Sequence, residues 1–222
     1  MAQTQQTIAA LHSLAPWSES NWLELSSNLL GLSGLIGGVD EVGRGALFGP
    51  VVAAAVILPT CALSELMAVG IKDSKKLSSS RRIQMAQLIS TVAIDWKIGF
   101  ASTAEIDQIN ILQATLLAMK RAVLKLKVQP VICLVDGNQL IKDLPVPQQT
   151  IVKGDERSLN IAAASIMAKV WRDDLVLRLA SNYPKYDITH NKGYGSQKHL
   201  LALREYGPSP LHRKSFRPCQ IQ

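Results

Sequence analysis

The sequence contains few aromatic residues and few cysteines. Aromatic side chains make up 5% of the 222 residues, so valine, isoleucine, leucine and alanine must fill the interior of a folded domain. The three cysteines, Cys61, Cys133 and Cys219, are far apart in sequence and include no C-x-x-C pair. This spacing indicates neither a disulfide framework nor a cysteine zinc site, and it favours a reducing compartment. We therefore expect a cytoplasmic protein.

The sequence also lacks long apolar runs and an excess of acidic residues. No run approaches the length needed to cross a membrane, and the first residues do not resemble a secretory signal, so we expect no membrane association. Lysine and arginine number 24 against 17 aspartates and glutamates, which gives a net charge of +7. Such a balance favours a polyanionic partner. The hydrophobic content of 47% is enough for one α/β core with a small appendage.

The pattern along the chain predicts three parts. Residues 1–34 are rich in Gln, Thr and Ser and are expected to form an N-terminal extension, either loose or docked as a short amphipathic helix. Residues 35–180 alternate between strand-like and helix-like segments, which predicts a mixed α/β core. Residues 181–222 are basic and interrupted by Gly and Pro, and they are expected to form a C-terminal helical, substrate-binding part.

Apolar runs and helical periodicity place the elements of this core. Ser102 and Glu105 fit a capping box, which predicts a helix from Thr103 that ends before Pro130. We expect strands at 35–39, 51–58, 92–100, 131–135 and 150–152. We expect further helices at 78–90, 161–179 and 197–205.

The adjacent acids Asp40 and Glu41 are the most informative pair in the chain. Neighbouring carboxylates repel each other, and burying them without cations or donors is costly. In an extended strand they point to opposite faces, so we expect one metal ion to use both only if the backbone bends there. Arg44, between Gly43 and Gly45, adds a donor fork suited to phosphate or sugar oxygens. Taken alone, the same residues would also fit a surface turn with two solvated acids.

Two further acids repeat this strand-end pattern. Asp136 follows the apolar run 131–135, and Asp155 follows the strand-like segment 150–152. Because functional groups gather at strand ends in open sheets, Asp40, Glu41, Asp136 and Asp155 are expected to converge on one rim. All four offer oxygen ligands, which suits Mg²⁺ or Mn²⁺ rather than zinc. For any one acid alone, a helix-cap or turn-cap role is the simpler interpretation.

Seven segments of the chain resemble, in order, the motifs of the ribonuclease HII (type 2 ribonuclease H) family. The resemblance covers roughly residues 35–218. Its motifs are the segments 38–45 (GVDEVGRG), 72–78 (KDSKKLS), 135–138 (VDGN), 153–155 (KGD), 163–170 (AASIMAKV), 192–195 (KGYG) and 212–216 (HRKSF).

The resemblance implies a fold and an activity. It implies an RNase H-like mixed sheet flanked by helices, with a small helical C-terminal part, and a monomeric protein. It implies an endoribonuclease that cleaves RNA in RNA–DNA hybrids and incises 5′ of single ribonucleotides embedded in duplex DNA. The reaction would be two-metal phosphodiester hydrolysis with Mn²⁺ or Mg²⁺, giving a 3′-hydroxyl and a 5′-phosphate.

The resemblance also assigns roles to residues. Asp40, Glu41, Asp136 and Asp155 would be the metal-binding and catalytic carboxylates. The loop of Gly43, Arg44 and Gly45 would sense the ribose 2′-hydroxyl, and Tyr194 would stack or hydrogen-bond at the same nucleotide. Ser74, Lys75 and Lys192 would contact the nucleic acid. The sequence departs from the family where Asn191 replaces a common histidine, with His190 one place earlier, and we expect this change to alter geometry rather than chemistry.

Two other hypotheses compete with a nuclease. The first is a non-catalytic protein that binds RNA–DNA junctions with the same fold; repelling carboxylates beside phosphates argue against it. The second is a dinucleotide-binding enzyme that uses Gly43 and Gly45. It fails because the third glycine of that motif is missing, since position 48 is Phe.

Overall fold

The structure, a computed structural model, describes residues 35–71 and 77–220. Five strands form one mixed sheet in the order β3-β2-β1-β4-β5. β1 pairs antiparallel with β2 and parallel with β4, so the mixed α/β sheet expected from the sequence is confirmed. The strands are β1 (Ile36–Val42), β2 (Val51–Ile57), β3 (Asp95–Ala101), β4 (Ile132–Asp136) and β5 (Gln148–Ile151).

Strand β2 lies inside the sheet, and helices cover both of its faces. All seven of its residues are buried, and they are valine, alanine or isoleucine. Because side chains alternate along a strand, Val51, Ala53, Ala55 and Ile57 pack in one apolar cluster, whereas Ala54 and Val56 pack in another. The small side chains of this strand allow helices to approach closely on both sides.

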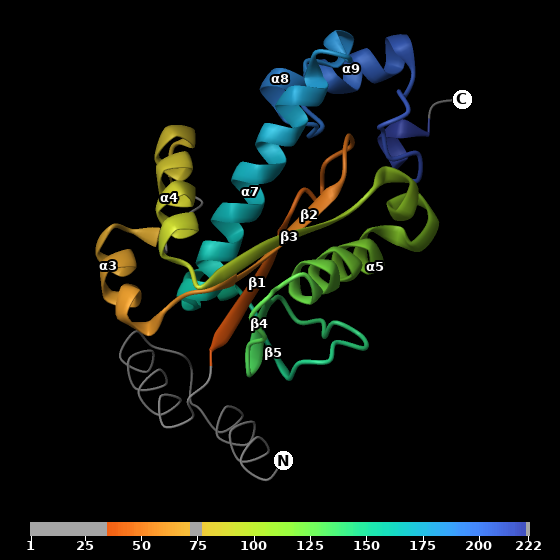
Figure 1. The fold of residues 1–222 in the computed structure, drawn as a ribbon. Coiled ribbons are helices and arrows are strands. Elements are labelled where there is room, and N and C mark those ends of the chain that lie inside the picture. The colour runs from red at the N-terminus through yellow and green to blue at the C-terminus, as the bar shows by residue number, and fades with distance from the viewer. Residues whose placement is uncertain (1–34, 72–76, 221–222) are drawn as a thin grey trace.

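The two long helices sandwich the sheet (Figure 1). Helix α5 (Thr103–Leu124) covers one face, and α7 (Leu159–Ala180) covers the other. Two glycines make these approaches possible. A Cβ atom on Gly38 would lie 2.1 Å from the backbone of Asn160 in α7, and one on Gly99 would lie 2.1 Å from the Ala118 carbonyl of α5. Helices α3 (Leu63–Ala68) and α4 (Ser79–Val92) pack beside α7, and the 3-10 helix η1 (Thr60–Ala62) precedes α3.

Most boundaries follow the sequence, with two informative differences. The predicted capping box of α5 is present, with Ser102 and Glu105 satisfying each other's backbone amides. The third strand begins at Asp95 rather than Val92, because α4 continues through Val92. The first strand continues past Val39 to Val42, because β2 offers it pairing partners to that point.

The C-terminal residues form short helices that pack on the end of α7. They share an apolar cluster with Leu47 and Phe48 of the β1–β2 loop and with Val176 of α7. The elements are η3 (Pro184–Tyr186), α8 (Ile188–Asn191), α9 (Gln197–Tyr206) and η4 (Arg217–Cys219). Among the described residues, no helix combines the length and apolar character that crossing a membrane requires.

Candidate active site

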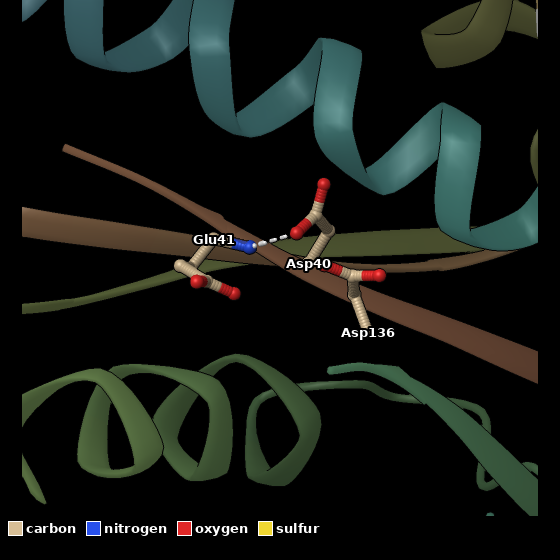
Figure 2. A group of neighbouring side chains, drawn as sticks. All are labelled: Asp40, Glu41 and Asp136. Atoms are coloured by element: carbon tan, nitrogen blue, oxygen red, sulfur yellow. Dashed lines mark hydrogen bonds between the residues drawn. The ribbon is translucent and has the colours of Figure 1, made fainter. Parts of the chain in front are cut away.

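The carboxylates of Asp40, Glu41 and Asp136 come together where β4 ends beside β1. Each offers one oxygen, and these three oxygens lie within 4.8 Å of one another (Figure 2). The parallel pairing of β1 with β4 stops at Val39 and Val135, which leaves the edge of β1 open at the two acids. The strand still pairs with β2 through Val42. The open edge, rather than the backbone bend that the sequence led us to require, therefore allows both side chains to reach the cluster.

Asp155 lies on the same cleft but outside this group of three. It belongs to the short helix α6 (Gly154–Arg157), one residue after Gly154, whose amide donates to Asp136 Oδ1 at 2.6 Å. Asp155 is 4% exposed and lines a cleft of about 390 Å³ together with the other three acids. The structure thus brings all four predicted acids to one cleft, although Asp155 is placed by a helical turn rather than by a strand end.

Burial and mutual repulsion raise the pKa values of the two β1 acids. Burial is the main reason that the pKa of Asp40 is well above its usual value, and the charges of Glu41 and Asp136 raise it further. Hydrogen bonds from the Ser165 side chain and the Glu41 amide, the latter 2.7 Å long, oppose this shift. The pKa of Glu41 is also raised, chiefly by burial, and Arg44 opposes the shift through a contact of 3.2 Å.

This donor set fits a hard divalent cation. Three carboxylate oxygens converge, and the charges of these acids disfavour one another's ionised forms. A bound cation would favour the ionised forms and relieve that repulsion. Neither sulfur nor imidazole belongs to the group, so its chemistry suits Mg²⁺ or Mn²⁺.

Helix α7 supplies a basic side chain, Lys169, to the cleft of the four acids. Lys169 lines the cleft with Ser165, one turn earlier on the same helix. Its ammonium group lies 2.8 Å from Asp173 and 5.7 Å from the centre of the Tyr194 ring. The i,i+4 spacing of Ser165 and Lys169 was the sequence signal for a shared face of the helix. Arg82 of α4 lines the same cleft.

The two glycines of the β1–β2 loop differ in their surroundings. Gly43 has a φ of +90°, and a Cβ atom there would lie 2.2 Å from Arg172 Nε. A Cβ atom on Gly45 would meet nothing within 4 Å. The fold therefore requires glycine at position 43, whereas position 45 faces open space.

Tyr194 and Lys192 lie in the turn between α8 and α9. The ring of Tyr194 lies close to two cations of α7, with Arg172 Cζ at 5.4 Å and Lys169 Nζ at 5.7 Å from its centre. The Lys192 carbonyl accepts a 3.0 Å hydrogen bond from Arg172, and its ammonium group contacts the Thr189 carbonyl. Tyr194 is thereby connected to the carboxylate cleft through Lys169.

Asn191 holds this turn, and His190 points elsewhere. The Asn191 amide donates to the Tyr186 carbonyl at 2.8 Å and accepts from the Gly193 amide at 2.7 Å. The side chain of His190 is 80% exposed and pairs with Asp187. Ser74 and Lys75 fall in 72–76, and the predicted extension falls in 1–34, so these predictions lie outside the described residues.

A mixed five-stranded sheet with carboxylates clustered at the end of its parallel pair defines the class of RNase H-like nucleases. Solved structures share this fold. Ribonuclease H2 from Pyrococcus horikoshii matches with a TM-score of 0.73 at 25% identity, covering 84% of this chain and 95% of that one. A ribonuclease HIII in complex with Mn²⁺ matches with a TM-score of 0.67 at 19% identity, covering 84% and 68%.

The sequence comparisons narrow the class to one family. The profile described as Ribonuclease HII matches residues 37–219. The ribonuclease HII of Trichormus variabilis is 68% identical over all of this chain and 98% of its own length, and that of a Nostoc species is 69% identical with the same coverage. The chain belongs to the ribonuclease HII family and is an RNase H endoribonuclease. The expected family is thus confirmed.

Proposed function

We propose that the protein hydrolyses RNA paired with DNA and incises duplex DNA on the 5′ side of a single embedded ribonucleotide. The observation that carries this proposal is the convergence of Asp40, Glu41 and Asp136 within 4.8 Å, in a cleft that Lys169 also lines. Asp155 completes the set of acids proposed to be catalytic. The products are a 3′-hydroxyl and a 5′-phosphate.

The chain's own residues prepare the cleft for a phosphodiester. Asp40, Glu41 and Asp136, with Asp155 on the same cleft, would hold two Mg²⁺ or Mn²⁺ ions, which when bound would supply Lewis-acid chemistry for phosphodiester hydrolysis. The Gly154 amide holds Asp136, and the Glu41 amide holds Asp40, so both carboxylates are oriented before substrate arrives. Lys169 is placed to contact a non-bridging phosphate oxygen.

Ribose recognition is assigned to the β1–β2 loop and Tyr194. The 2′-hydroxyl is the group that distinguishes one ribonucleotide from its deoxy neighbours. Gly45 faces open space, which leaves its backbone accessible to a sugar, and Arg44 beside it is exposed. Lys192, with Ser74 and Lys75, is proposed to contact the phosphate backbone.

Cleavage of an end-labelled DNA duplex that carries one ribonucleotide tests this function. We expect incision on its 5′ side with Mg²⁺ or Mn²⁺ and none with EDTA. The isosteric Asp136→Asn variant keeps an oxygen that can accept from Gly154, so it should fold, yet its kcat should fall by at least about 100-fold. The matched control is Asp143→Asn, because that side chain is 73% exposed and lies outside the cleft.

The outcomes separate the competing hypotheses. Wild-type turnover by Asp136→Asn would refute the assigned site. Tight binding of the duplex without cleavage at any metal concentration would instead support the junction-binding alternative.

A further inference from the structure

Two arginines beside the proposed ribose-reading loop are completely buried. Arg172 on α7 and Arg213 in the C-terminal part are both 0% exposed. Within the described ranges, neither guanidinium forms an ion pair with a carboxylate. A buried charge without such a partner is costly unless hydrogen bonds replace its hydration. The acceptors of these hydrogen bonds therefore show which parts of the chain the two arginines hold in place.

Among the described residues, the two guanidinium groups donate six hydrogen bonds, and all six go to backbone carbonyls. Arg213 donates to the carbonyls of Gly43 at 2.7 Å, Arg44 at 2.8 Å and Gly49 at 3.0 Å. Burial lowers the pKa of Arg213 to about 9, and the charge of Arg172 adds to that shift. The remaining three acceptors belong to Arg172 and are the carbonyls of Phe48 at 3.0 Å, Pro50 at 3.1 Å and Lys192 at 3.0 Å.

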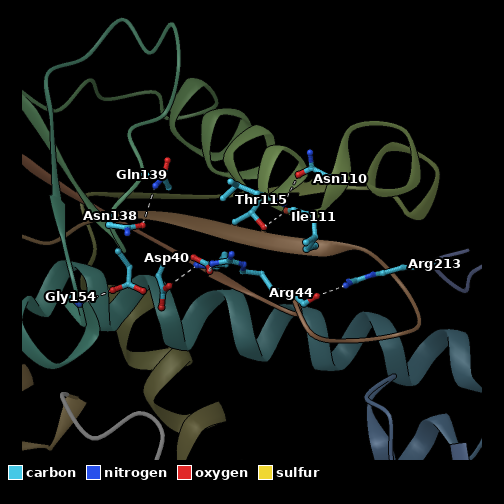
Figure 3. Close-up of polar contacts among 12 residues, drawn as sticks. Asp40, Arg44, Asn110, Ile111, Thr115, Asn138, Gln139, Gly154 and Arg213 are labelled. Carbon is cyan, nitrogen blue, oxygen red and sulfur yellow. Dashed lines mark hydrogen bonds and ion pairs between the residues drawn. The ribbon is translucent and has the colours of Figure 1, made fainter. Parts of the chain in front are cut away.

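The geometry of the peptide bond converts these contacts into an orientation of the loop. In a planar trans peptide, the carbonyl and the following N–H point in opposite directions. Because the Gly43 and Arg44 carbonyls point at Arg213, the amides of Arg44 and Gly45 point away from it. Figure 3 shows the hydrogen bond from Arg213 to the Arg44 carbonyl.

Arg172 ties the same loop to the turn that carries Tyr194. Its guanidinium lies over the Tyr194 ring at 5.4 Å while it binds the loop carbonyls and that of Lys192. The Gly193 carbonyl in turn accepts from the amides of Leu47 at 2.8 Å and Phe48 at 3.2 Å. The loop and Tyr194 are therefore held in one fixed spacing.

We propose that Arg172 and Arg213 are positioning residues for ribose recognition, which they serve by aiming the Arg44 and Gly45 amides at the 2′-hydroxyl opposite Tyr194. This inference rests on the proposed function. A lysine in either place keeps the charge but presents a single ammonium, which cannot reproduce a fork that spans three carbonyls. Arg213→Lys should therefore loosen the loop without removing any group that touches the nucleic acid.

The test measures how much one 2′-hydroxyl contributes to binding when position 213 is arginine and when it is lysine. Dissociation constants are compared for two duplexes that differ only in that hydroxyl, with the Asp136→Asn background suppressing cleavage. We expect the protein with Arg213 to prefer the ribonucleotide duplex about 10-fold, the scale of a good hydrogen bond, and Arg213→Lys to lose most of that preference. In the cleaving protein, Arg213→Lys should lower kcat by about 10- to 100-fold with a smaller change in KM.

The control separates positioning from general destabilisation. Ile57→Val removes one methylene from the buried end of β2, at the opposite end of that strand from the loop, and serves as a destabilised reference. It should keep the full preference for the ribonucleotide duplex. A folded Arg213→Lys variant that also keeps the full preference would overturn the proposal.

Should Arg213→Lys fail to fold, Arg172→Lys can replace it, because that variant leaves the three hydrogen bonds of Arg213 intact. Its dissociation constants for the same two duplexes are then compared, and a full preference for the ribonucleotide duplex would again overturn the proposal. Failure of the wild-type protein to incise the single-ribonucleotide duplex would instead refute the proposed function, which distinguishes the two failures.

Discussion

At the scale of single residues, alanine substitutions at Gly43 and Gly45 should affect stability very differently, although the two glycines lie two positions apart. Alanine at position 43 must adopt a φ near +90° and would overlap Arg172 Nε. We expect Gly43→Ala to lower the free energy of unfolding by more than about 2 kcal/mol, since backbone strain and steric overlap add together. Gly45→Ala should change it by less than about 0.5 kcal/mol, because its Cβ atom meets open space. Denaturant titration measures both values.

The activity of Gly45→Ala should not follow its stability. If the open side of Gly45 receives the sugar, Gly45→Ala should fold normally and still lose at least about 10-fold in kcat/KM for the single-ribonucleotide duplex. Full activity in Gly45→Ala would show that the sugar does not approach this position.

At the scale of elements, a buried histidine pair joins α9 to the loop that follows it. The Ser209 amide donates to His212 Nδ1 at 2.9 Å, so His212 carries its proton on Nε2. That proton is donated to His199 Nε2 at 2.9 Å, which leaves His199 Nδ1 to donate to the Tyr194 carbonyl at 2.8 Å. A proton added to His199 Nε2 would face the N–H of His212, and one added to His212 Nδ1 would face the Ser209 amide, so these hydrogen bonds favour two neutral rings.

This pair predicts that stability decreases on acidification. Burial, and then the charge of His199, lowers the pKa of His212 from 6.5 to about 4. Between these values the unfolded chain binds a proton that the folded chain does not, so the stabilisation is complete above pH 6.5 and is lost as the pH falls towards 4. The loss is about 1.4 kcal/mol per pH unit for a full proton. Unfolding at pH 7, 6 and 5 should show a shallower slope for His212→Gln than for the exposed control His190→Gln. Equal slopes would contradict this prediction.

Local signals in the sequence predicted the elements that short-range chemistry determines. The capping box of α5 and the all-apolar strand β2 can be predicted from the sequence because each depends on residues that are close together in the chain. The convergence of Asp40 with Asp136 followed from strand ends in one sheet. The sequence did not reveal the hydrogen bonds of Arg213, because its acceptors lie 164 to 170 positions earlier in the chain. They are also backbone carbonyls, which every residue type carries.

At the scale of the whole molecule, the net charge of +7 should make catalysis sensitive to salt. Each phosphate contact that releases a counterion adds about 0.9 to the slope of log affinity against log salt concentration. With subsaturating substrate, kcat/KM should follow the same trend. If Lys169 contacts a phosphate from the cleft, Lys169→Gln should reduce this slope by about 1. Lys125→Gln is the matched control, because Lys125 directly follows α5 and donates to the Ile98 carbonyl of β3, away from the β1–β4 side where the acids lie. A reduction shared by both variants would assign the salt effect to overall charge, whereas a reduction confined to Lys169→Gln would place a phosphate beside the carboxylates.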